Sequence, residues 1–221
     1  MHALEHQRQL IVATVFLLAW LGLPRLGLSL AGPVAVALAA VAAVVCVRRG
    51  GEGWAALGLA APARPLRLLW VGPAYAVIGY LAAIAATLLA TQLLGWAPMQ
   101  SGKVGAVQGN LPALLGMLAI AWTTAALGEE LLFRGFLQGR LQALLAGRRG
   151  AGLLAALAQG LVFGLAHAYQ GATGILVTGV LGLVFGLLYL RSKSLWPLVI
   201  AHGLIDTLSL VALYAGKLPA Q

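Results

Sequence analysis

The chain has 221 residues, of which 62% are hydrophobic and only 9% are charged, and its mean hydropathy is +0.97. No soluble domain of this length needs so much apolar surface, so the composition excludes a soluble globular protein and favours one integral membrane domain, residues 1–221. The net charge of +9 comes from basic residues that lie between apolar runs, without a patch interleaved with aromatic residues, which argues against a nucleic-acid partner.

Apolar runs of membrane-spanning length recur along the whole chain and predict an all-α polytopic transmembrane bundle of about seven or eight spans. Polar loops separate seven of them, at residues 9–24, 28–47, 68–95, 111–140, 152–168, 173–190 and 195–214. Gly160 and Gly164 in one run, and Gly182 and Gly186 in another, follow the small-xxx-small pattern that lets helices approach closely, although glycine is also simply common in membrane helices.

The distribution of basic residues predicts the orientation of the chain. With a cytoplasmic N-terminus, most of them fall on the cytoplasmic side: Arg8, Arg48, Arg49, Arg64, Arg67, Arg140, Arg148, Arg149, Arg191 and Lys193. Arg25, Lys103 and Lys217 fall on the other side. Because cytoplasmic loops are enriched in Lys and Arg, we expect an inside N-terminus, in a bacterial inner membrane as the Ala/Gly/Leu-rich composition suggests.

Five acidic residues and histidines lie inside the apolar segments of the C-terminal half, namely Glu129, Glu130, His167, His202 and Asp206. Ionisable groups at membrane depth are costly and are usually functional. They can meet only if the fourth span continues past the glutamates to about Arg140, since a helix rises about 1.5 Å per residue. One shared site for general acid–base chemistry or for a metal would satisfy all of them together.

Glu130 and Arg134 are four residues apart, with the glutamate first, which is the favourable order for a helical ion pair. Glu129 lies about 100° around the helix from Glu130, so we expect it to remain free and to serve as a general base. The alternative is that both glutamates lie at an interfacial helix end, with Arg134 extending to the membrane surface.

Each of the two histidines also has a catalytic and a structural interpretation. His202 and Asp206 are also four residues apart, so the acid could orient the imidazole ring or act beside it, or the pair could only help to pack the bundle. His167 follows Phe163 by one helical turn and ends its span, where an interfacial polar role is the alternative to catalysis.

Three motifs in order resemble the CPBP family of intramembrane proteases, the CAAX-protease and bacteriocin-processing group. They are EExxxR at Glu129–Arg134, FxxxH at Phe163–His167 and HxxxN/D at His202–Asp206. The resemblance covers about residues 111–210, which we take as the catalytic core, and it implies a helical bundle with a conical catalytic cavity open to the cytosol.

The resemblance also implies a role for each motif residue. Glu129 would activate water, His167 would position it, and His202 with Asp206 would stabilise the oxyanion, while Glu130 and Arg134 would support the site. Asp206 departs from the more usual asparagine, and an ionised aspartate cannot donate a hydrogen bond to an oxyanion. It would therefore be protonated, orient His202 or ligate a metal.

The metal content stays open at this point. Members of the family are often named metalloproteases, and His167 and His202 with Glu129 or Asp206 would make a plausible zinc set. No HExxH occurs and the histidines come from different helices, so we favour a mechanism without a fixed metal.

The sequence thus predicts an intramembrane endopeptidase that acts on a membrane-associated peptide or protein. A proton-coupled transporter is one alternative, because buried Glu, His and Asp also build proton relays. A non-catalytic bacteriocin immunity protein with a relic site is the other.

Overall fold

The computed structural model describes the backbone of residues 2–27, 30–100 and 106–217, and their side chains apart from those of residues 2–8 and 10. Throughout these ranges the regular structure is helical and there is no strand, which confirms the all-α prediction. The long helices are α1 (His2–Gly22), α2 (Ala31–Arg49), α3 (Leu68–Leu88), α6 (Ala151–Ala166), α7 (Gly171–Ser192) and α8 (Trp196–Tyr214). Between α3 and α6, the helical segments α4 (Leu111–Ile120), η6 (Ala121–Gln138) and α5 (Gly139–Leu144) follow one another without a break.

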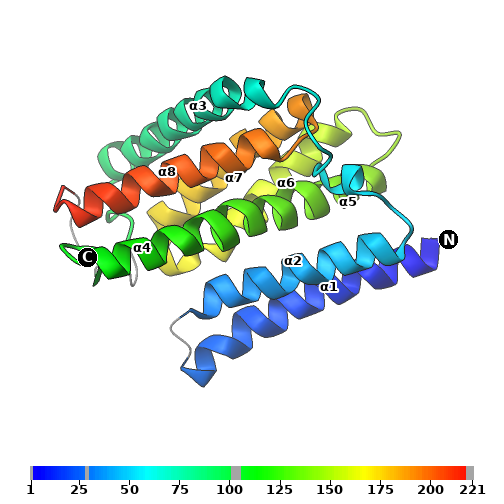
Figure 1. Ribbon diagram of the computed structural model, residues 1–221, viewed down its shortest axis with the longest axis horizontal. Helices are drawn as coiled ribbons and strands as arrows, with labels where there is room; N and C mark the ends of the chain where they lie inside the picture. Colours follow the sequence, from blue (N-terminus) through cyan, green and yellow to red (C-terminus); the bar gives the residue numbers. More distant parts are fainter. Residues whose placement is uncertain (1, 28–29, 101–105, 218–221) are drawn as a thin grey trace.

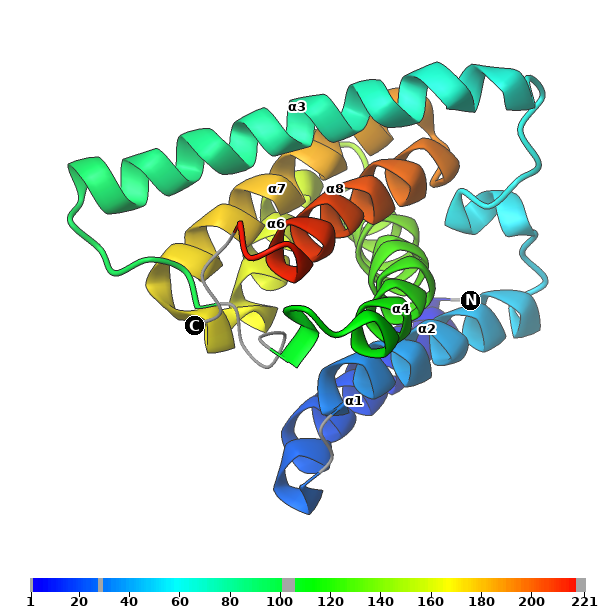
Figure 2. The same ribbon diagram turned by 60° about the vertical axis from the view of Figure 1, so that its left-hand side comes forward.

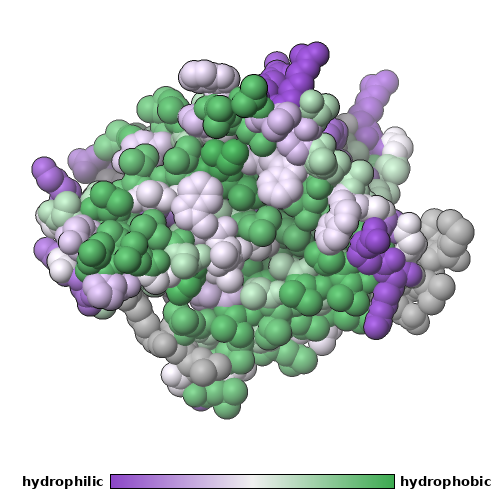
Figure 3. All heavy atoms as spheres, viewed as in Figure 1, coloured by the Kyte–Doolittle hydropathy of each residue, from purple (hydrophilic) through white to green (hydrophobic). Residues whose placement is uncertain are grey.

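Five helical stretches are long and apolar enough to cross a membrane: Ala31–Arg49, Pro65–Leu93, Leu111–Leu144, Ala168–Ser192 and Trp196–Tyr214. Ile11–Leu26 and Ala151–Ala166 are shorter apolar helices. Together they account for the seven predicted runs and confirm a polytopic helical bundle. Figure 3 shows apolar residues over much of one face, with strongly hydrophilic residues toward its edges.

The fourth predicted span is a single long helix that passes the glutamates, as a shared site requires. Asn110 begins it by accepting a hydrogen bond from the backbone N–H of Ala113 (3.2 Å). Its middle part, η6, is π-helical rather than α-helical, a form often found at functional sites. At the start of η6 the hydroxyls of Thr123 and Thr124 donate to the carbonyls of Ala119 and Ile120, which gives those carbonyls a partner where the helix widens. Hydrophobic spacing alone does not distinguish this wider helix from the α-helix that we assumed.

Close packing between α6 and α7 explains the glycine pattern. A Cβ on Gly164 would lie 2.6 Å from the carbonyl oxygen of Ile175, and a Cβ on Gly160 would lie 2.9 Å from the backbone nitrogen of Leu183. Neither backbone can yield, so the two helices pack at a distance that only glycine permits.

The remaining helices surround this pair. α3 packs on α7 and α8, while the α1–α2 hairpin packs on η6, where Phe16 meets Phe133 edge to face at 6.1 Å. In Figure 2 the hairpin lies on one side of the α4 helix, and α3, α7 and α8 lie on the other. The helices run side by side along the long axis of the molecule (Figure 1).

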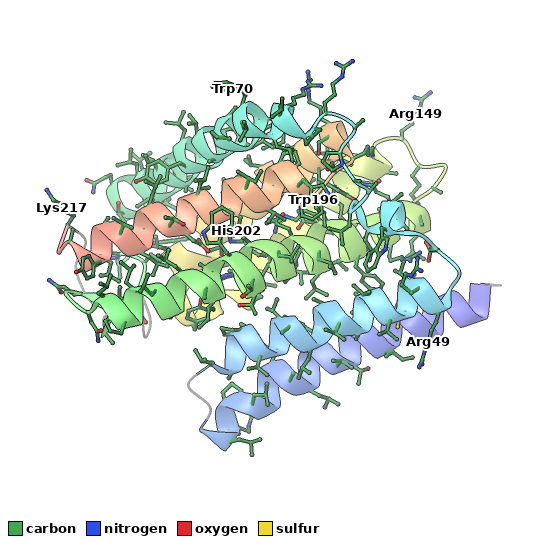
Figure 4. The ribbon with its side chains drawn as sticks, viewed as in Figure 1. Arg49, Trp70, Arg149, Trp196, His202 and Lys217 are labelled. Atoms are coloured by element: carbon green, nitrogen blue, oxygen red, sulfur yellow. The ribbon has the colours of Figure 1, made fainter. Side chains whose placement is uncertain are left out.

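The bundle has two ends, which we call the basic end and the opposite end. At the basic end the 50–67 loop meets the α7–α8 connection, because the N–H of Leu195 donates to Gly58 and the indole of Trp196 donates to Ala60. At the opposite end the N–H of Gln100 donates to Gln170, and the hydroxyl of Thr173 donates to Ala97. Arg49 and Arg149 lie toward the basic end and Lys217 lies at the opposite end (Figure 4).

Candidate active site

The predicted site residues of η6 and α8 face one another in the interior of the bundle. His202 donates from Nδ1 to Oε1 of Glu130 at 2.9 Å, across 72 positions of the sequence. The same oxygen accepts a hydrogen bond from Arg134 at 3.0 Å. Glu130 therefore joins the first and third motifs, and the donated proton leaves Nε2 of His202 as the ring atom that is free for chemistry.

Arg134 is completely buried, yet its guanidinium has partners on several sides. Besides the ion pair with Glu130, the guanidinium carbon lies 4.4 Å from the ring centre of Phe163 and 5.5 Å from that of Phe185. Aromatic faces attract a cation most strongly where water is absent. These contacts exclude the alternative in which Arg134 extends to the membrane surface.

Two carboxylates lie near Nε2 of His202. Oε2 of Glu129 is 4.0 Å from that nitrogen, and Oδ2 of Asp206 is 3.7 Å from it. Both distances are too long for a direct hydrogen bond and are suited to a bridging water or to a substrate atom. The side chains of Glu129 and Asp206 are 15% and 30% exposed, whereas that of Glu130 is fully buried, so the adjacent glutamates have different environments.

His167 reaches the cluster through an aromatic contact. Its Nδ1 donates to the carbonyl of Phe163 at 2.8 Å, and its ring lies 4.6 Å from the Phe163 ring. Because Phe163 also contacts Arg134, this one side chain separates His167 from the ion pair. The local hydrogen bond leaves Nε2 of His167 as an acceptor.

The structure therefore brings five of the six predicted residues into direct contact or within about 4 Å of a neighbour in the cluster, and it places His167 one side chain away. Sequence reasoning assigned Glu130 to Arg134 alone and missed its bond to His202. A bond between helices 72 positions apart depends on how those helices pack, which residue spacing within one helix does not specify.

A second polar group was also missed, on the side of the site that faces the basic end. Gln138 donates to the carbonyl of Gly186 (3.0 Å), and Gln159 donates to that of Gly182 (2.7 Å). Both glutamines are completely buried. The available signal was spacing, because Gln138 follows Arg134 by four residues and Gln159 precedes Phe163 by four.

Trp122 contributes a further link between η6 and α8. Its indole donates to the hydroxyl of Thr207 at 3.1 Å, and a Cβ on Gly203 would lie 2.6 Å from its ring. Gly203, the residue after His202, thus lets the indole approach α8 closely.

The metal set considered above does not assemble. Within residues whose side chains are described, no group of three or more His, Cys, Asp or Glu converges as metal ligands do. The hydrogen bonds at Nδ1 of both histidines leave Nε2 of each ring available, as in histidines that do bind metals, so these bonds do not decide the question. Because the ligands do not converge, we derive no chemical step through a metal.

Residues 111–208 match the family model described as type II CAAX prenyl endopeptidase Rce1-like. This part of the chain is similar to the Rce1-like family. The match contains all three motifs and confirms the resemblance drawn from them.

The match to an endopeptidase family indicates that the protein is a protease, and it supports membrane-associated proteins as the general kind of substrate. No curated protein and no solved structure matches the chain.

Proposed function

We propose that the protein is an intramembrane endopeptidase in which Glu129 activates a water molecule for attack on a peptide bond. The observation that carries this proposal is the 4.0 Å separation between Oε2 of Glu129 and Nε2 of His202. A water molecule can form hydrogen bonds to both atoms at once across such a gap. Glu129 is suited to the role because its neighbour Glu130 already balances the charge of Arg134.

The reaction then needs two proton transfers. Glu129 takes a proton from the water while the water oxygen attacks the carbonyl carbon of the peptide bond. This attack gives a tetrahedral intermediate with a negatively charged oxygen. Glu129 returns that proton to the amide nitrogen as the carbon–nitrogen bond breaks, and the products are a carboxylic acid and an amine.

His202 is placed to stabilise the intermediate. With Nδ1 bonded to Glu130, a protonated ring presents Nε2–H toward the space between Glu129 and Asp206. Donors positioned in advance toward a developing oxyanion are among the largest contributions to catalysis. The 3.7 Å contact supports Asp206 as the electrostatic partner that favours this protonated form. His167, held by its bond to Phe163, would position the water.

We further propose that residues 111–210 form the catalytic core within a single domain, 1–221, of a bacterial inner-membrane protein. The contacts described for Glu129, Glu130, Arg134, His202 and Asp206 all lie inside that core. Substrates would be peptides undergoing maturation, bacteriocins or signalling proteins, since a prenylated protein is not expected in such a cell.

Proteolysis in liposomes against a pool of lipidated and transmembrane peptides tests this function. The wild type should cleave a member of the pool, Glu129→Gln should not, and a chelator should leave cleavage unchanged. Glu52→Gln is a matched control, because Glu52 is a carboxylate outside the site that pairs with Arg140 at 2.6 Å.

The outcomes separate the alternatives. Cleavage by Glu129→Gln would refute the role of this residue, and loss of activity with a chelator would restore the metal hypothesis. Proton-coupled transport that fails in Glu129→Gln, with no cleavage by any form, would support a transporter. Bacteriocin protection that survives in both Glu129→Ala and His167→Ala would support an immunity protein.

A further inference from the structure

A series of buried polar contacts crosses the bundle from α6 to α8. It begins at Gln159 on α6, whose amide nitrogen donates to the carbonyl oxygen of Gly182 on α7 at 2.7 Å. The same carbonyl oxygen lies 3.5 Å from a terminal nitrogen of Arg134 on η6. Arg134 pairs with Glu130, and Glu130 accepts the hydrogen bond from His202 on α8. Every side chain in this series is buried, so the series joins Gln159 to the reacting histidine without passing through solvent.

Gln159 and Arg134 use the same acceptor, the carbonyl oxygen of Gly182. The 2.7 Å contact from Gln159 lies within the usual range of an N–H···O hydrogen bond, whereas the 3.5 Å contact from Arg134 lies beyond it. A carbonyl oxygen has two lone pairs, and inside a helix one of them accepts the backbone N–H four residues later. Because Gln159 takes the other lone pair, Arg134 is left with Glu130, at 3.0 Å, as its close acceptor.

The other neighbours of the guanidinium of Arg134 do not direct it to one acceptor. Its carbon lies 4.4 Å from the ring centre of Phe163 and 5.5 Å from that of Phe185, and neither ring offers a lone pair. Nε of Arg134 is buried and has no hydrogen-bond partner among the described residues. The position of the guanidinium therefore depends on the balance between Glu130 and the Gly182 carbonyl.

A second glutamine holds the same stretch of α7. Gln138 on η6 donates to the carbonyl of Gly186, one turn after Gly182, at 3.0 Å. A Cβ on Gly186 would lie 2.5 Å from Nε2 of Gln159 and 2.9 Å from Oε1 of Gln138, so the two amides meet over this glycine. Together they tie α7 to both α6 and η6, and so they fix the place of the Gly182 carbonyl beside Arg134.

We propose that Gln159, by occupying the Gly182 carbonyl, is a positioning residue of the active site. Arg134 is thereby held on Glu130, and the bond from Glu130 to Nδ1 sets the rotation of the His202 ring. A shift of Glu130 toward a displaced guanidinium would turn Nε2 of His202 away from the space where water attacks the peptide bond. This inference rests on the protease function proposed above.

Replacing Gln159 with methionine tests this role, because methionine has a similar length and no amide group. In Gln159→Met the guanidinium can move onto the freed carbonyl. We then expect kcat to fall by about 10- to 10²-fold with KM changed by less than about twofold, since a small misplacement of a catalytic group costs rate rather than binding. Gln142→Met is the matched control. Gln142 is one turn beyond Gln138 and partly buried, and its amide nitrogen has no hydrogen-bond partner, so kcat should not change.

The imidazole resonances give a second measurement, which needs no substrate. In protein labelled with ¹⁵N-histidine and held in detergent micelles, His202→Gln and His167→Gln assign the two hydrogen-bonded Nδ1–H resonances. Gln159→Met should shift the His202 resonance or speed its exchange with water. The His167 resonance should stay in place, because that ring donates to its own helix at Phe163 and serves as an internal control for packing.

An unchanged His202 resonance in Gln159→Met would overturn the proposal, and so would equal losses of kcat in Gln159→Met and Gln142→Met. A change in both histidine resonances would also contradict it, because it would indicate a general loss of packing. If Gln159→Met does not fold, Gln159→Asn, whose side chain is one methylene too short to reach Gly182, is measured against the same outcomes. If the wild type cleaves no peptide, the proposed protease function fails, while the resonances still decide whether Gln159 positions His202.

Discussion

Glu129 and Glu130 are adjacent in sequence, yet they belong to two different regions of the molecule. Glu130 lies in the buried interior, where Arg134 and His202 share one of its oxygens and no part of its side chain is exposed. Glu129 lies where side chains are partly exposed, 4.0 Å from Nε2 of His202 and 15% exposed. A carboxylate that forms direct hydrogen bonds to buried partners stabilises the fold. A carboxylate that lies near a polar atom without a direct hydrogen bond to it remains available for chemistry. The four predictions below test this division, from the largest expected effect to the smallest.

The strongest test removes the charge of Glu129. We expect Glu129→Gln to lower the rate of peptide cleavage by about 10²- to 10⁴-fold, because general-base catalysis contributes on that scale. Thermal unfolding in detergent should be nearly unchanged, since no direct hydrogen bond is lost. A variant that unfolds far more easily would show that Glu129 is structural and would remove the contrast between the two glutamates.

Breaking the buried ion pair should affect folding instead. Arg134→Ala leaves Glu130 charged in the interior without its guanidinium partner, a change that typically costs about 3–5 kcal/mol. Folded yield and the denaturation midpoint measure this loss. Arg140→Ala is the matched control, because its pair with Glu52 is partly exposed and should be worth no more than about 1 kcal/mol. Equal effects of the two substitutions would contradict the distinction between the regions.

Substitutions at Asp206 test whether this partly exposed carboxylate takes part in catalysis. Asp206→Asn keeps a polar group beside Nε2 of His202, so cleavage should persist within about tenfold, while Asp206→Ala removes the partner of the His202 oxyanion donor and should lose about 10²-fold. The measurement is kcat against KM for the same peptide. Equal activity of the alanine variant and the wild type would exclude Asp206 from the site.

The smallest expected effect is on stability, from a change in packing against the buried glutamines Gln138 and Gln159. A Cβ on Gly186 would lie 2.5 Å from Nε2 of Gln159 and 2.9 Å from Oε1 of Gln138, so Gly186→Ala should cost about 1–3 kcal/mol of stability. Gly139→Ala is the control, because a Cβ there meets nothing within 4 Å and alanine favours the helix by up to about 1 kcal/mol. Chemical denaturation distinguishes the two, and a stabilised Gly186→Ala would show that the glutamines are not held as described.

Several features of this protein follow from the sequence alone. Apolar runs of spanning length specify a helical membrane protein because every backbone polar group in lipid must be bonded within a helix or a closed barrel. The four-residue spacings predict the Glu130–Arg134 pair and the proximity of Asp206 to His202, because residues at that spacing lie on one helix face. The three motifs in order were sufficient to recognise the protease family.

Tertiary structure decided the rest. Contacts between segments that lie far apart in the chain include the bond from His202 to Glu130, the aromatic contacts of Arg134, and the buried contacts of Gln138, Gln159 and Leu57. The depth of each ionisable group depends on how these helices pack against one another. Residue periodicity determines which face of a helix is apolar, but helices slide and rotate relative to one another at little local cost. Only close contacts such as those at the α6–α7 glycines determine the final positions of the ionisable groups.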